Sequence, residues 1–315
     1  MRARARVGAT RAAGSGMIDA PSPARQNLLV PSPLPLRRLL VAATAVLAVA
    51  GCAPADTNSA PATAATCTPG ALPTRTDGIL TVGTDQPVYP PWYIDDDPTS
   101  GNGFESAVAY AIAGELGYPR DKVTWARVPF NAAVQPGPKA FDLNLTEFSI
   151  TDERRQAVDF SAPYYDVKQA VVALASSPFA GATTVAALKD ARLGAQVGTT
   201  SYEAIVDQIK PSAQPAVFNT NDDAKLALTN GQVDAIVVDL PTAFFITSAE
   251  LQGSKIVGQL PAGSGTPEQF GAVLDKGSPL TGCVSAAVER LRSAGTLTAL
   301  EQQWLASAGS APALK

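Results

Sequence analysis

The hydrophobic and polar positions of the chain change their period several times, and each period predicts a different element. A short apolar stretch at 78–85 predicts a strand. Apolar residues then recur at helical spacing over 104–116 and stop at Gly117, which predicts a helix. The residues on this apolar face are Phe104, Val108, Ala111, Ile112 and Leu116. Residues 122–128 and 141–145 predict two further strands.

The next hundred residues alternate between strand-like apolar runs and segments with helical periodicity. Predicted strands lie at 169–174, 192–197, 216–219 and 233–239, and predicted helices at 201–209 and 222–229. This alternation predicts a parallel sheet with helices on its faces. A strand at 270–274 and helices at 281–293 and 297–306 follow, so we expect an α/β protein.

The N-terminal part has a different pattern. Arg37 and Arg38 precede an apolar run at 39–50, which predicts an export signal over residues 1–51. About 20 apolar residues are needed to span a bilayer, and this run is much shorter. The stretch before residue 33 is long for a signal, which favours a later start codon such as Met17. Residues 52–75 are rich in Ala, Pro and Thr, which predicts a flexible tether.

The end of the apolar run suggests a lipid anchor. Residues 47–52 read L-A-V-A-G-C and resemble a bacterial lipobox, in which the cysteine is lipidated. This resemblance implies a protein held by Cys52 on the outer face of the cytoplasmic membrane, because several acyl chains anchor stably. The alternative is an ordinary signal peptide with a chance cysteine.

Charge and composition exclude several function classes. Without residues 1–51, the chain keeps 17 basic and 27 acidic residues, a net charge of −10. An acidic protein repels the phosphate backbone, so this charge disfavours nucleic-acid binding. The chain has no histidine, the commonest general base and metal ligand, and we expect no metal or cofactor. Cys67 and Cys283 form an even pair in an exported protein, which favours a disulfide between the N-terminal arm and a C-terminal helix. The alternative is two free thiols.

One segment points to a family. Residues 148–165 read F-S-I-T-D-E-R-R-Q-A-V-D-F-S-A-P-Y-Y. They resemble the periplasmic amino-acid-binding proteins of ABC importers, whose pattern is S-I-T-x-x-R followed by V-x-F-S-x-P-Y-Y. The resemblance covers about residues 78–307. It implies a monomer that delivers an amino acid to an ABC permease in the membrane.

The resemblance also implies an architecture, the two-lobed type II periplasmic-binding-protein fold. Each lobe is then a sheet flanked by helices, and the ligand binds in the interlobe cleft. We expect the first lobe at 76–172 plus 268–310 and the second at 173–267. The hinge strands would lie near Val172 and Phe270.

An amino acid presents a carboxylate and an ammonium, and the resemblance assigns a residue to each. Arg154 falls on the arginine that binds the carboxylate, for which a planar guanidinium is well suited. Residues 231–239 match G-x-V-D-A-x-x-x-D, whose last residue, Asp239, contacts the amine. Thr200 falls on a contact position of a G-T-T turn, although helix capping is a common alternative role for threonine. Ser149 is expected near the α-amino end.

The remaining candidates would recognise the ligand side chain or contact the ligand from the second lobe. Tyr89 takes the position of a stacking aromatic, and Trp92 lies close by, although aromatics beside prolines often only pack. Glu147 would favour a cationic side chain and reject an acidic one. The alternatives are that Glu147 faces solvent or pairs with Arg155. The other predicted site residues are Gln196 and Thr199; Asp85 is offset from the family pattern and is not included.

Two other functions compete with amino-acid capture. Some proteins of this fold are dehydratases of cyclohexadienyl acids, and Glu147 could then serve as a general acid. A structural or adhesive surface lipoprotein would leave the Arg154 and Asp239 motifs unexplained. The sequence has no histidine, no nucleophile motif and no cluster of metal ligands, and it therefore favours a binding protein over an enzyme.

Overall fold

The computed structural model describes residues 67–263, 267–305 and 311–315. The predicted export signal over 1–51, the lipidation site Cys52 and most of the predicted tether lie outside these residues. Within the described ranges, each helix is too short or too polar to cross a membrane.

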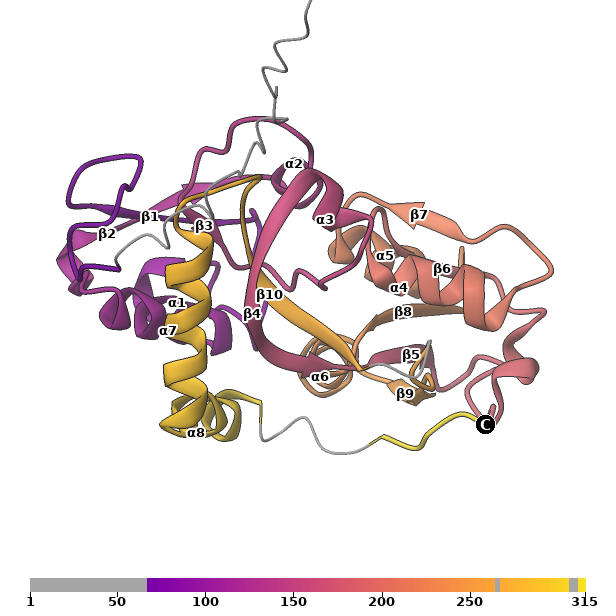
Figure 1. The fold of residues 1–315 in the computed structure, drawn as a ribbon. Helices are drawn as coiled ribbons and strands as arrows, with labels where there is room; N and C mark the ends of the chain where they lie inside the picture. Colours follow the sequence, from indigo (N-terminus) through magenta and orange to yellow (C-terminus); the bar gives the residue numbers. More distant parts are fainter. Residues whose placement is uncertain (1–66, 264–266, 306–310) are drawn as a thin grey trace, which may run out of the picture. The chain divides into compact units, whose positions relative to one another are not determined.

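The first sheet has the strand order β2-β1-β3-β10-β4 (Figure 1). Its strands are β1 (Leu80–Thr84), β2 (Val123–Arg127), β3 (Leu143–Asn144), β4 (Val158–Val167) and β10 (Glu268–Asp275). β1 runs parallel to β2 and β3, whereas β10 is antiparallel to β3 and β4. The chain therefore returns to this sheet after building a second one.

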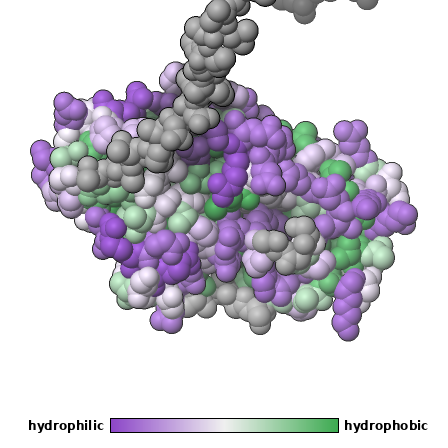
Figure 2. All heavy atoms as spheres, in the orientation of Figure 1, coloured by the Kyte–Doolittle hydropathy of each residue, from purple (hydrophilic) through white to green (hydrophobic). Residues whose placement is uncertain are grey.

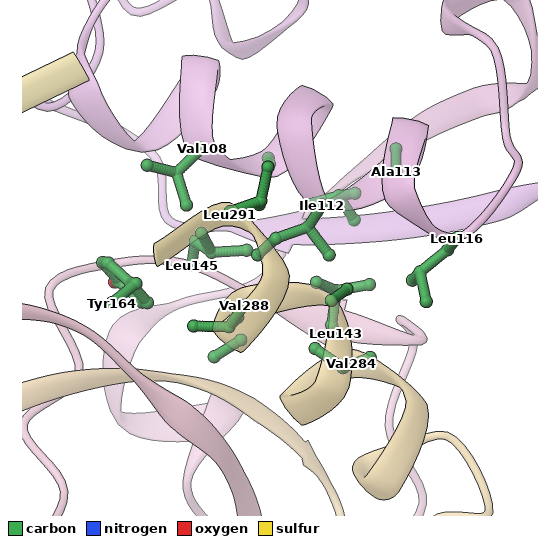
Figure 3. Packing of buried hydrophobic residues seen from close by; sticks show 14 of the residues in the cluster. Val108, Ile112, Ala113, Leu116, Leu143, Leu145, Tyr164, Val284, Val288 and Leu291 are labelled. Atoms are coloured by element: carbon green, nitrogen blue, oxygen red, sulfur yellow. The ribbon is translucent and has the colours of Figure 1, made fainter. Parts of the chain in front are cut away.

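Three longer helices accompany the first sheet, besides the one-turn helices α2 (Phe130–Ala133) and α3 (Arg154–Ala157). They are α1 (Phe104–Glu115), α7 (Thr281–Ser293) and α8 (Thr296–Trp304). The apolar side chains of α1 and α7 meet those of β3 and the following residue in one core (Figure 3). This core includes Val108, Ile112 and Leu116, which confirms the predicted apolar face of the helix. Ala111, on the same face, is only partly buried.

The second sheet has the strand order β7-β6-β8-β5-β9. Its strands are β5 (Gln169–Leu174), β6 (Leu193–Gln196), β7 (Ala216–Phe218), β8 (Ala235–Asp239) and β9 (Ser254–Gln259). The α-helices of this part are α4 (Thr200–Ala204), α5 (Asn221–Thr229) and α6 (Leu240–Phe245). β6 is parallel to β7 and β8, but β5 is antiparallel to β8 and β9, so only part of the predicted parallel sheet forms.

Strand pairing places β5 in the second sheet. The sequence predicts residues 169–172 in the first lobe, yet β5 pairs on both sides with strands of the second sheet. Val172 is buried in the middle of β5, opposite Ile236 and Ile256, and is therefore not at a crossover. The chain passes between the sheets at Lys168, from the end of β4 to the start of β5. The C-terminal residues also reach the second sheet, because Ala313 bridges Gln259 of β9.

A disulfide joins Cys67 to Cys283, which lies in the first turn of α7, with 5.5 Å between their Cα atoms. This confirms the predicted pairing across 216 residues. The face shown in Figure 2 is mostly hydrophilic, with hydrophobic residues scattered among polar ones. Among the described residues, the exposed large hydrophobic side chains are Val206, Val217 and Leu226.

Candidate functional site

One pocket is lined by residues at or just beyond the ends of strands of both sheets. Its lining residues are Asp85, Pro87, Val88, Tyr89, Phe130, Thr146, Glu147, Arg154, Gln196, Thr199, Thr200, Ser201, Asn221, Val238 and Asp239. Most of the predicted site residues are among them, and the exceptions are Ser149 and Trp92. Pockets at the ends of strands in open α/β sheets are a common place for small ligands.

Arg154 begins the short helix α3 (Arg154–Ala157), and its backbone N–H donates to the Thr151 hydroxyl at 3.1 Å. Its guanidinium donates to the Ser149 carbonyl at 2.7 Å and to the Gly198 carbonyl at 2.9 Å. It lies 5.6 Å from the centre of the Phe130 ring, and burial lowers its pKa. A guanidinium has five N–H groups, so donors remain for a ligand carboxylate.

Gly198 is the residue through which the second sheet contacts Arg154. Its φ of +73° lies in the left-handed region, and a Cβ there would come within 2.2 Å of the Asn131 side chain. A substitution would therefore both strain the backbone and displace Asn131. Glycine at this position lets the loop after β6 approach Arg154 closely.

Glu147 faces the pocket. Its carboxylate accepts a hydrogen bond from the Thr242 hydroxyl at 3.2 Å and lies within hydrogen-bonding reach of the Asp239 carboxyl. Burial and then the charge of Asp239 raise the pKa of Glu147 well above its usual range. Arg155 instead lies over the Phe160 ring at 5.7 Å, so the structure differs from the alternative of a Glu147–Arg155 pair.

Asp239 ends β8 and immediately precedes α6. One carboxylate oxygen accepts a hydrogen bond from the Gln169 side-chain amide at 2.7 Å, across the β5–β8 pairing. Burial and then the charge of Glu268 raise its pKa well above the usual range. The other aspartate of the motif, Asp234, binds Arg192 at 2.6 Å and has a local structural role.

The threonines at the start of α4 have two different partners. The Thr199 hydroxyl accepts from the Tyr202 backbone N–H at 3.2 Å, as a helix cap does, and donates to the Gln196 carbonyl at 2.7 Å. The Thr200 hydroxyl donates to Glu268 at 2.6 Å. Thr200 thus lines the pocket while it bonds to the first residue of β10.

Two predicted ligand residues lie outside the lining. The Ser149 hydroxyl donates to Glu268 at 2.5 Å. Trp92 is fully buried, and its indole N–H donates to the Thr242 hydroxyl at 2.8 Å. The packing alternative therefore describes Trp92, because an indole with no exposed surface and an internal acceptor has no free face for a ligand.

Several residues of the site were not predicted. Asp85 lines the pocket, its carboxylate accepts from the Gln86 N–H at 2.7 Å, and burial raises its pKa. Its position at the end of a strand was the available signal. Glu268, Gln169 and Thr242 bind predicted residues from distant parts of the sequence, and no local pattern marks them.

The ionisable groups of the lining are mostly acidic. Asp85, Glu147 and Asp239 supply three carboxyl groups against the single cation Arg154. Two carboxyl groups in contact disfavour full ionisation of both, unless a cation lies between them. In the part of the chain that the structure describes, no group of three or more His, Cys, Asp or Glu could hold a metal ion.

Comparison with known proteins identifies the relatives. The family described as "Bacterial extracellular solute-binding proteins, family 3" matches residues 80–307. An arginine-binding periplasmic protein of Mannheimia haemolytica is 26% identical and aligns over 70% of this chain and 89% of its own length. An L-arginine-binding protein of Pseudomonas aeruginosa is 28% identical and aligns over 75% and 94%, respectively.

Solved structures of amino-acid-binding proteins are also similar to this chain. An ancestral arginine-binding protein bound to arginine is 30% identical, with a TM-score of 0.59 over 72% of this chain and 97% of that one. An ancestral amino-acid-binding protein, a precursor of cyclohexadienyl dehydratase, is 28% identical, with a TM-score of 0.59 over 72% and 94%. These likenesses confirm the predicted two-lobed type II fold.

Proposed function

The chain belongs to family 3 of the bacterial extracellular solute-binding proteins, and on this premise we propose that it captures an L-amino acid with a cationic side chain for an ABC importer. The observation that carries the proposal is the excess of carboxylates in the pocket lining. Three carboxyl groups face one guanidinium there. A ligand with one carboxylate and two cationic groups complements this set.

The two poles of the amino acid have separate partners in this proposal. Arg154 binds the α-carboxylate with the N–H groups that its carbonyl partners leave available. Asp239 accepts the α-ammonium, and its Gln169 hydrogen bond holds the carboxylate in place. Thr200 and Ser201 line the pocket beside these groups, and their hydroxyls donate to Glu268 and to the Gln169 side chain.

Glu147 is the proposed selector for the ligand side chain, with Asp85 as a second carboxylate. A cationic group would relieve the repulsion between Glu147 and Asp239, whereas an acidic side chain would add to it in a desolvated site. Tyr89 also lines the pocket and is the proposed stacking partner, with the Lys225 ammonium 5.4 Å from its ring centre. Gln196 and Thr199 complete the wall on the side of the second sheet.

The relatives support amino-acid capture and leave the amino acid open. Two relatives are named as arginine-binding proteins and another, from Escherichia coli, as an L-cystine-binding protein. An ancestral arginine-binding protein has also been solved with glutamine bound. The carboxylates of this pocket, rather than the names of relatives, favour a cationic ligand. The named relatives also support a binding protein over an enzyme.

The setting of the protein follows from the family and from the N-terminal sequence. As a solute-binding protein it acts outside the cytoplasm and hands its ligand to a membrane permease. We further propose that it is a monomer anchored through a lipidated Cys52, and that its lobes move about Lys168. Loss of membrane association in a Cys52→Ser variant would support the anchor, whereas unchanged association would contradict it.

Calorimetric titration of the exported chain tests the function. The protein is unfolded and refolded beforehand to remove any ligand carried through purification. L-arginine and L-citrulline are compared, because they differ in a guanidinium against a neutral urea of similar shape. Arginine should bind at least tenfold more tightly, about 1.4 kcal/mol. Equal affinities would refute the cationic preference, and conversion of a cyclohexadienyl acid by the same sample would favour the enzyme alternative.

A further inference from the structure

Glu147 has a backbone conformation that needs support. Its φ is +51°, in the left-handed region that non-glycine residues seldom adopt. This conformation occurs in the segment that turns the Glu147 carboxylate toward Thr242 and Asp239. Residues in sparsely populated conformations persist when neighbouring groups fix them, and such residues cluster at ligand sites.

The carboxyl group of Glu105 holds the backbone of Glu147 in this conformation. Glu105 lies in the first turn of α1 and is fully buried, and its carboxylate accepts the backbone N–H of Glu147 at 2.7 Å. The same oxygen accepts a hydrogen bond from the Tyr164 hydroxyl. The second carboxylate oxygen is buried and has no hydrogen-bond partner. Burial of a carboxyl group is costly, and the two buried hydrogen bonds that one of its oxygens accepts offset part of this cost.

We propose that Glu105 is a positioning residue for ligand selection: it holds the left-handed turn at Glu147 and so keeps the Glu147 carboxylate directed at the ligand side chain. Glu105 does not line the pocket and contacts Glu147 through a hydrogen bond to its backbone. The inference rests on the proposed function, because it assigns Glu147 to the recognition of a cation.

The other end of Glu147 is fixed from the opposite direction. Thr242, at the start of α6, donates to the Glu147 carboxylate and accepts the indole N–H of Trp92. With the backbone held by Glu105 and the carboxylate held by Thr242, the side chain is fixed at both ends. Loss of the Glu105 bond would free the turn and let the carboxylate leave its place, without removing any group from the pocket.

Three variants separate this role from general stabilisation. Glu105→Asp keeps the charge but withdraws the acceptor by about one C–C bond length, 1.5 Å. Glu105→Gln keeps an acceptor oxygen at the original reach. Tyr164→Phe is the matched control, since it removes an equally buried hydrogen bond to the same carboxylate and leaves the bond to Glu147 intact.

The measured quantity is the ratio of the dissociation constants for L-citrulline and L-arginine, determined by calorimetry on the full exported chain. In Glu105→Asp the ratio should fall by about tenfold, the usual effect of losing a hydrogen bond to a charged group. In Glu105→Gln and Tyr164→Phe it should stay within about threefold of wild type. A merely structural role would lower melting temperature in all variants without changing the ratio.

A double-variant cycle completes the test. If Glu105 acts through Glu147, Glu105→Asp should leave the ratio unchanged when Glu147→Gln is already present. An unchanged ratio in Glu105→Asp alone, or an equal fall in Tyr164→Phe, would overturn the positioning role while the proposed function stands. A wild-type protein without preference for arginine would instead refute the proposed function, and the positioning role with it.

Discussion

Replacement of Glu147 by glutamine tests the selector directly, because it removes one charge and keeps nearly the same shape. A guanidinium about 4 Å from a carboxylate, at an effective dielectric constant of about 20, is attracted by about 4 kcal/mol. The retained hydrogen bond and the desolvation of both groups reduce this loss. Hydrogen bonds to charged groups contribute about 1.5–3 kcal/mol, so the Kd for arginine should rise about 10- to 150-fold.

The assay is calorimetric titration with L-arginine and L-citrulline, with Glu289→Gln as the matched control. Glu289 is exposed on α7 and outside the pocket lining, so its replacement should change neither affinity. Citrulline affinity should change little in Glu147→Gln. The ligand-free protein should melt at the same or a higher temperature, because one buried charge next to Asp239 is removed. A parallel loss of affinity for both ligands, or no loss for either, would refute the reasoning.

Three further predictions concern the carboxylate-binding residue Arg154, the dependence of stability on pH, and the disulfide. Arg154→Lys should weaken arginine and citrulline binding alike, by about tenfold or more in calorimetry, because lysine lacks the bidentate geometry; a selective effect on arginine would contradict the assignment. Burial raises the pKa of Glu105 to about 7. The folded state therefore keeps a proton on Glu105 at pH values where the unfolded state has already lost it. Stability should therefore fall, by at most about 3 kcal/mol, as pH rises from 4 to 8. Calorimetric melting should show a smaller decline in Glu105→Gln, and an equal decline would argue against Glu105 as the source. Replacing Cys67 and Cys283 by serine should lower stability in denaturant titrations by about 2–5 kcal/mol; an unchanged midpoint would show that the bridge contributes little.

Local patterns predicted the elements well and their grouping less well. The apolar face of α1, the alternation of strands and helices and the Cys67–Cys283 pair follow from the sequence and appear in the structure. The expected grouping of residues 169–172 with the first lobe differs from their strand pairing. An apolar run gives the length of a strand but not its partners, and β5 pairs with β8 and β9, which begin 61 and 80 residues after β5 ends.

Most of the predicted site residues line the pocket, but Ser149 and Trp92 do not. Motifs placed Arg154, Asp239 and Thr200 at the pocket because each stands in a recognisable segment. Ser149 and Trp92 stand in equally recognisable segments, yet their polar groups bind Glu268 and Thr242, far away in the sequence. Side-chain direction depends on such distant partners.

Glu105 illustrates what the sequence alone does not reveal. A glutamate in the first turn of a helix is ordinarily explained by the helix dipole. Here it is fully buried and bound to the backbone of Glu147, 42 residues away. Only the fold brings the two residues together.

The central claim is that the pocket selects a cationic amino acid, and a thermal-shift screen of the refolded chain against all common amino acids, with ornithine and citrulline, tests it most directly. A ligand that binds the folded state raises the melting temperature by mass action. We predict shifts for arginine, lysine or ornithine that exceed those for every neutral or acidic amino acid. A largest shift with glutamate or aspartate, or no shift with any amino acid, would contradict the claim.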